Sequence, residues 1–76
     1  GRAGFHQILL VGAGALGSRH LQSMCALPAL EIFVIEPDPE ARQRCQLLPQ
    51  IASYPYIRWY SSVAEIPCRL FDVAIL

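Results

Sequence analysis

The chain has 76 residues and a formal net charge of zero, with six basic and six acidic residues. Because these charges are spread along the chain, no basic stripe is available for nucleic acid phosphates or for an anionic membrane. The longest apolar run falls far short of the ~20 residues of a membrane span and no signal peptide pattern is present, so we expect a soluble, cytoplasmic protein.

Continuous apolar runs predict strands that are buried on both faces of a parallel sheet. Residues 8–11 form the first run, which Gly12 closes, and residues 32–35 and 73–76 repeat the pattern. A weaker run at residues 57–60 has β-type side chains and predicts a further short strand.

Between the first two runs, the chain predicts a helix that begins at about Ala15 and that Pro28 terminates. Four side chains recur there at spacings of three and four and define one helix face. They are Leu16, His20, Met24 and Leu27.

A second helix is predicted with Asp38 at the N-cap, Pro39 at the first helical position and Glu40 in the first turn. We expect Pro49 and Pro55 to end it and to separate it from the strand at 57–60. Its expected sheet-facing side chains are Ala41, Cys45 and Leu48.

A third, much shorter helical segment is predicted after that strand. Ser62 and Glu65 have the spacing of a capping box, and Pro67 should end the segment after about one turn.

This alternation of strands and helices predicts the N-terminal half of a Rossmann-type, doubly wound α/β domain with strand order 3-2-1-4. Because the fourth strand runs to Leu76, we expect residues 1–76 to be a partial dinucleotide-binding domain that lacks its remainder and a substrate domain. The unpaired edge of that strand predicts poor stability or association for the isolated chain.

A glycine-rich motif of the form GxGxxG follows the first predicted strand and opens the first predicted helix, the context in which it indicates a dinucleotide site. Its residues are Gly12, Ala13, Gly14, Ala15, Leu16 and Gly17. In this motif the first glycine allows a tight turn, the second lets the backbone approach a pyrophosphate, and the third lets the helix pack close to the strand.

Glu36 ends the second predicted strand 19 residues after Gly17, near the spacing of the acid that accepts hydrogen bonds from an adenosine ribose. A carboxylate there would repel the 2′-phosphate of NADP, and Pro37 and Asp38 offer that phosphate no cation. The sequence therefore favours NAD over NADP as the cofactor, with Arg42 and Arg44 interpreted as a solvated helix face.

Three segments of the chain resemble the N-terminal domain of the glucose-fructose oxidoreductase, inositol dehydrogenase and MocA family. They are residues 10–21, with the continuation Gly17-Ser18-Arg19-His20-Leu21, residues 35–41 and residues 72–76. The resemblance implies an NAD(P)-dependent, homo-oligomeric oxidoreductase that acts on a sugar, a polyol or a related hydroxy compound. The family's catalytic lysine, aspartate and histidine would lie beyond Leu76, so no catalytic residue is carried over.

Two other functions share the glycine motif and the acid. A non-catalytic NAD-sensing domain, as in channels and transporters, carries both features. A ThiF-like adenylating domain has a similar loop for ATP, but the helix after Glu36 does not show the pattern of Arg, Lys and Asp residues that such enzymes place around the triphosphate.

The remaining candidate residues favour structural roles. His20 is expected to pack against its neighbours, and His6 has no second metal ligand near it in sequence. Three widely spaced cysteines without a CxxC pair predict free thiols that are mostly buried.

Overall fold

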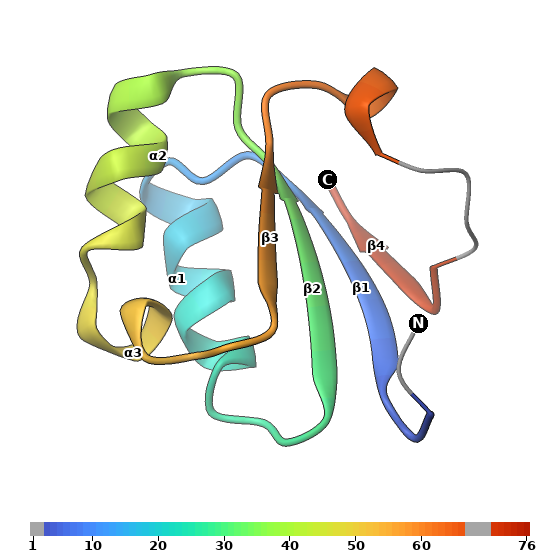
Figure 1. Cartoon of the computed structure of the whole chain (residues 1–76). Helices are drawn as coiled ribbons and strands as arrows, with labels where there is room; N and C mark the ends of the chain where they lie inside the picture. Colours follow the sequence, from blue (N-terminus) through green and yellow to red (C-terminus); the bar gives the residue numbers. More distant parts are fainter. Residues whose placement is uncertain (1–2, 67–70) are drawn as a thin grey trace.

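A four-stranded parallel sheet runs through the computed structural model, which describes residues 3–66 and 71–76. The strands are β1 (His6–Val11), β2 (Leu30–Ile35), β3 (Ile57–Tyr60) and β4 (Val73–Ile75). They lie in the order β3-β2-β1-β4, which confirms the predicted order (Figure 1). β1 and β2 each begin two residues earlier than predicted, because the pairs His6↔Leu30 and Gln7↔Glu31 extend their ladder.

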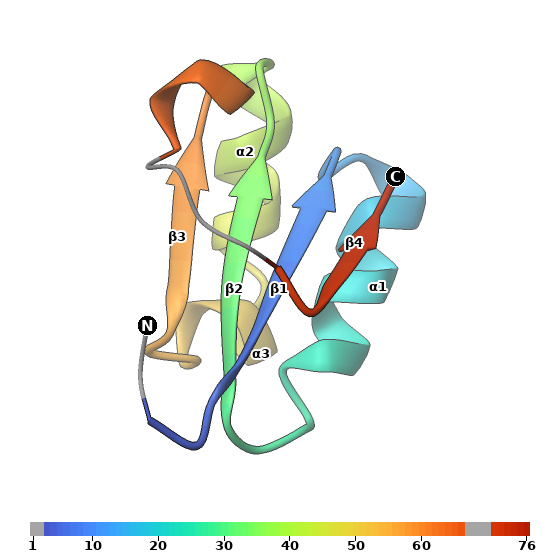
Figure 2. The same cartoon turned by 90° about the vertical axis from the view of Figure 1, so that its right-hand side faces the viewer.

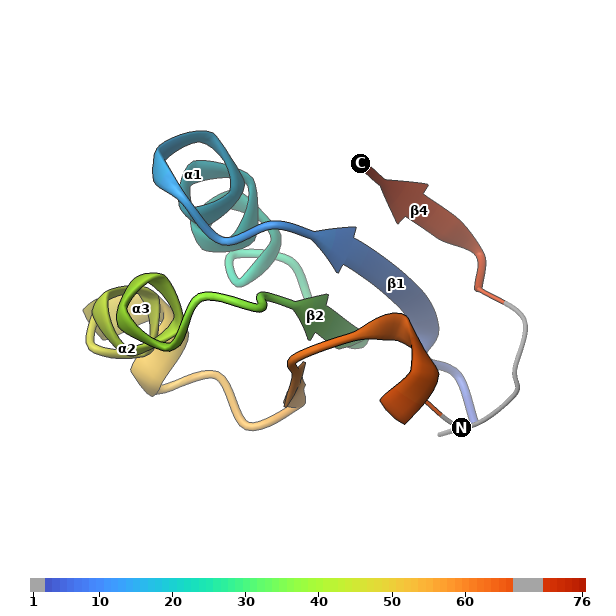
Figure 3. The ribbon, with the colours of Figure 1, turned by 90° about the horizontal axis from the view of Figure 1, so that it is seen from above.

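Three helices cover one face of this sheet, as the view from above shows (Figure 3). They are α1 (Ala15–Met24), α2 (Pro39–Gln46) and α3 (Pro49–Ala52). The short 3₁₀ helix η1 (Val63–Glu65) lies on the opposite side of the sheet from these helices. Figure 2 shows the sheet from that side, with the α-helices behind it. In the described parts of the chain, no helix is long and apolar enough to span a membrane.

The main core lies between the sheet and the three helices, since alternate strand residues point toward the helices. Leu10, Ile32 and Val34 from the strands are buried there against Leu21 and Cys45. Burial of these apolar side chains is the main force that holds the helices on the sheet.

The opposite face of β2 is also buried. Phe33 is fully buried, and its ring contacts Tyr60 and Phe71. Glu31 is 2% exposed and is compensated by the Arg58 guanidinium at 3.5 Å and by a hydrogen bond from Gln7 Nε2 at 3.0 Å. β2 therefore has the uniformly buried pattern of a central strand in a parallel sheet.

The predicted inner face of the first helix is correct only at Met24, which is buried. Leu16 is 66% exposed and His20 and Leu27 are also exposed, whereas Leu21, outside the predicted face, is buried. Gly17 lies at the point where α1 is closest to the β1–α1 loop, because a Cβ at Gly17 would collide with the Gly12 carbonyl oxygen. Gly17 and Leu21, four residues apart, therefore face inward, and the expected packing role of His20 is wrong.

Two predicted helix ends are also corrected. α1 ends at Met24, four residues before Pro28, and the chain turns into β2 with Ala29 at a φ of 59°. Pro28 disfavours a helical conformation at the residue before it, so the helix stops earlier than the proline. Pro49 does not simply end the second helix: it occupies the first turn of α3, where its fixed φ suits a helix start.

The predicted caps are confirmed. The Asp38 side chain accepts a hydrogen bond from the Glu40 amide at 3.0 Å, with Pro39 next to it. Ser62 and Glu65 form the capping box of η1, in which Glu65 accepts from the Ser62 amide at 3.0 Å. Ala41 and Cys45 face the core as expected, and Leu48 packs against it from beyond the end of α2. Pro67 lies outside the described residues.

Candidate functional site

The loop between β1 and α1 leaves the sheet at the carboxyl end of its central strands, the edge where open parallel sheets bind ligands. Gly12 has a φ of +94°, a left-handed conformation that side chains rarely adopt, and its amide donates to the Ile35 carbonyl at 2.8 Å. Gly12 and Gly17 are thus required by the turn and by the close approach of α1 to the loop.

Gly14 differs from the other two glycines of the motif. It is the N-cap of α1 with an ordinary φ of −73°, and no heavy atom lies within 4 Å of the point that a Cβ would occupy. The protein itself therefore has no steric need for glycine at this position. The open space in front of Gly14 is available to a ligand that approaches the backbone.

The first turn of α1 presents free hydrogen-bond donors beside Gly14. No side chain caps this helix and no acidic residue lies in its first turn. The first helical bond runs from the Ser18 amide to the Gly14 carbonyl at 2.8 Å, and no described residue accepts from the amides of 14–17. Unpaired amides and the positive end of the helix dipole favour an anion at this point.

Glu36 lies at the end of β2 and meets the glycine loop directly. Glu36 is only 7% exposed. Its Oε1 accepts a hydrogen bond from the Ala13 amide at 2.6 Å, and its Oε2 accepts one from the Asp38 amide at 2.9 Å. No cation pairs with Glu36 among residues 3–66 and 71–76. The glycine loop and the strand-end acid are thus in direct contact, as expected of neighbours at the carboxyl ends of β1 and β2.

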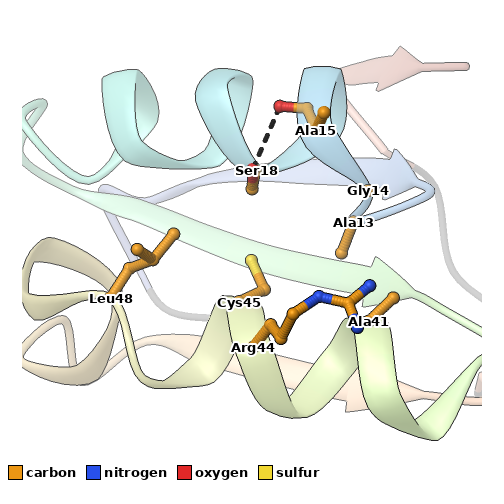
Figure 4. Close-up of a pocket in the computed structure, with 8 residues that line it drawn as sticks. All are labelled: Ala13, Gly14, Ala15, Ser18, Ala41, Arg44, Cys45 and Leu48. Atoms are coloured by element: carbon orange, nitrogen blue, oxygen red, sulfur yellow. Dashed lines mark hydrogen bonds between the residues drawn. The ribbon is translucent and has the colours of Figure 1, made fainter.

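Two hollows flank the loop, and Gly14 lines both. One, of about 340 Å³, lies between α1 and α2 and is lined by Ala15, Arg44 and Cys45 (Figure 4). The other, of about 280 Å³, lies on the β4 side and is lined by apolar residues and His20. A ligand anchored at Gly14 therefore has space on either side of the loop.

The other candidate side chains lie around this site. Arg42 donates to Ser61 Oγ at 3.1 Å, so its guanidinium is turned toward the β3–η1 loop, whereas Arg44 lines the hollow between α1 and α2. In the described part of the chain, no group of three His, Cys, Asp or Glu side chains is arranged to hold a metal ion.

The two described cysteines are free. Cys45 belongs to the core between the helices and the sheet, and Cys25 packs against that core. Burial raises the pKa of both thiols above the ordinary value of 9.0. The neighbouring Cys45 further raises the pKa of Cys25, and the charge of Glu36 further raises the pKa of Cys45. Both thiols therefore stay protonated at neutral pH and are poor nucleophiles.

No family model matches this chain, and no curated protein or solved structure matches it either.

Sequence reasoning missed the hydrogen bond between Ala13 and Glu36 and the position of His20 beside the β4-side hollow. The GxGxxG motif and the acid spacing indicate which two segments meet, but they do not say whether the acid contacts the loop or only a ligand. For His20, the signal was available in Gly17, because a glycine at a helix–strand contact fixes which helix face turns inward.

Proposed function

We propose that this chain binds a dinucleotide at its glycine loop and Glu36, as the N-terminal half of a Rossmann-type, doubly wound domain. The parallel sheet order β3-β2-β1-β4, with the loop following the interior strand β1, supports this proposal. In such sheets a ligand lies outside the carboxyl ends of the strands, close to the first helix N-terminus.

The observation that carries the proposal is the open space at Gly14 beside unpaired amides. The fold requires glycine at Gly12 and Gly17 but not at Gly14. A pyrophosphate that approaches the backbone would require glycine at Gly14. The amides of α1 would then donate to the phosphate oxygens, and the helix dipole would stabilise their charge.

Glu36 supports NAD rather than NADP as the dinucleotide. Each of its carboxylate oxygens accepts one backbone hydrogen bond, which leaves capacity to accept from the two hydroxyls of an adenosine ribose. A 2′-phosphate would meet this buried negative charge instead, and Arg42, the nearest arginine in sequence, is bonded to Ser61.

We further propose that the whole protein is an NAD-dependent oxidoreductase that acts on a sugar, a polyol or a related hydroxy compound. This part depends on the resemblance of residues 10–21 and 35–41 to the glucose-fructose oxidoreductase, inositol dehydrogenase and MocA family. No described residue is assigned to the chemical step, and the role of this chain in the reaction is to hold and orient the cofactor.

The test is a fluorescence titration of this chain with NADH, NADPH and ATP, followed by an assay of the whole protein with NAD and a panel of sugars and polyols. We expect this chain to bind NADH saturably and at least several-fold more tightly than NADPH, and the whole protein to oxidise a hydroxy compound. NADH binding without turnover by the whole protein would indicate an NAD-sensing domain, and ATP binding without NADH binding would indicate an adenylating domain. Equal or reversed affinities for NADH and NADPH would contradict the role of Glu36.

A further inference from the structure

We propose that Glu36 is also a positioning residue: its carboxylate holds the glycine loop in the conformation that directs the α1 amides at an anion. This inference rests on the proposed dinucleotide site and adds a second role for Glu36, besides contact with a ribose. It concerns the loop in the free protein, before any ligand is bound.

The carboxylate joins the two loops that form the site. Oε1 accepts from Ala13 in the β1–α1 loop at 2.6 Å, and Oε2 accepts from Asp38 in the β2–α2 loop at 2.9 Å. Hydrogen bonds to a charged acceptor are stronger than neutral ones, and this acceptor and its partner Ala13 are 7% and 3% exposed. Glu36 therefore fixes both loop ends against the carboxyl edge of the sheet.

The same bond divides the amides of the loop into two sets. The Ala13 amide is committed to Glu36, whereas the amides of residues 14–17 have no acceptor among the described residues. The Ala13 amide is directed toward Glu36 at the end of β2, and the next residue, Gly14, is the N-cap from which α1 and its free amides begin. Without the carboxylate, the buried Ala13 amide would lose its partner and the loop could rotate to regain one.

Charge alone predicts the opposite effect of losing this carboxylate. A negative group beside an anion site weakens anion binding, so its neutralisation should tighten the binding of a phosphate ligand. If Glu36 positions the loop, its neutralisation should weaken that binding instead. A ligand without a ribose separates the two effects, because it cannot contact Glu36 through hydroxyl groups.

The experiment measures the affinity of inorganic pyrophosphate for the protein, for Glu36→Ala and for the control Glu40→Ala. Alanine at position 36 leaves the Ala13 amide without its side-chain acceptor, whereas Glu40 is exposed in the first turn of α2, so its variant removes the same charge without touching the loop. We expect Glu36→Ala to weaken pyrophosphate binding at least threefold and Glu40→Ala to leave it unchanged or slightly tighter. Unchanged or tighter binding by Glu36→Ala would overturn the inference.

Amide hydrogen exchange gives a second readout that needs no ligand. We expect the Ala13 amide to exchange at least tenfold faster in Glu36→Ala than in the unaltered protein, while the core amides of Leu10 and Ile32 keep their protection. An Ala13 amide that stays equally protected would refute the positioning role. If the unaltered protein bound neither pyrophosphate nor NADH, the proposed function would fail, and the exchange of Ala13 alone would decide whether Glu36 orders the loop.

Discussion

The three glycines of the loop differ in what a side chain would meet at each position. At Gly12 the φ of +94° itself excludes most side chains, and at Gly17 the obstacle is the Gly12 carbonyl oxygen. At Gly14 a methyl group would meet nothing within 4 Å. A substitution at Gly14 should therefore act on ligand binding, whereas a substitution at Gly17 should act on folding.

For Gly14→Ala we expect NADH affinity to fall about tenfold or more, because the methyl group would occupy the space of the pyrophosphate. The free energy of unfolding should change by no more than about 1 kcal/mol, the usual range for an altered N-cap residue. Fluorescence titration and urea denaturation measure the two quantities. Retained NADH affinity would mean that the open space at Gly14 has no ligand.

At the scale of elements, α1 depends on one close contact with the β1–α1 loop. Gly17 makes that contact, and it fixes the rotation of the helix so that Leu21 and Met24 enter the core. Leu16 remains exposed although it is apolar. The contact thus determines which helix face covers the sheet.

Gly17→Ala should destabilise the protein by about 2 kcal/mol or more, since the new methyl group would overlap backbone that cannot move aside easily. This loss would outweigh the ~1 kcal/mol by which alanine favours a helix interior over glycine. Urea denaturation of Gly17→Ala and Gly14→Ala side by side gives the comparison. Equal stability of the two variants would show that α1 can shift without loss.

Some of the strands and helices can be predicted from the sequence, and others cannot. The apolar runs at 8–11 and 32–35 predict strands because a strand buried on both faces leaves little other choice of side chain. The inner face of α1 is not predictable from apolar spacing alone, since Leu16 and Met24 fit one stripe, but the contact at Gly17 leaves Leu16 exposed and only Met24 buried. α3 is missed because a proline such as Pro49 can follow the end of one helix or stand in the first turn of the next. The sequence alone does not show which of the two applies.

The candidate site was also predictable only in part. Spacing indicates that Gly14 and Glu36 meet at one edge of the sheet, because both follow neighbouring parallel strands. The bond from the Ala13 amide to Glu36 depends on side-chain direction and on the turn at Gly12, which no spacing rule contains.

At the scale of the whole molecule, the three α-helices cover one face of the sheet (Figure 1), and the two described thiols lie in or against the core between these helices and the sheet. The pKa values of Cys25 and Cys45 are raised, first by burial, so the folded state holds their protons more tightly than the unfolded state. Their contribution to stability is complete below the ordinary pKa of 9.0 and is lost as the pH rises through the folded values.

We therefore expect Cys25 and Cys45 to react with iodoacetamide at least tenfold more slowly in the folded protein than in urea at pH 8. A Cys68→Ser background confines the reaction to these two thiols, and mass spectrometry measures it. Stability in this background should decline above pH 9. A Cys45 thiol that reacts at the unfolded rate would contradict the burial described here.

The most direct test of the central claim, a dinucleotide site at the glycine loop and Glu36, is a titration of ¹⁵N-labelled protein with NAD followed by two-dimensional NMR. We predict saturable shifts of the amides of residues 12–17, Glu36 and Asp38, with much smaller shifts at the exposed end of α3. Absence of saturable shifts, or saturable shifts confined to residues away from these two loops, would contradict the account.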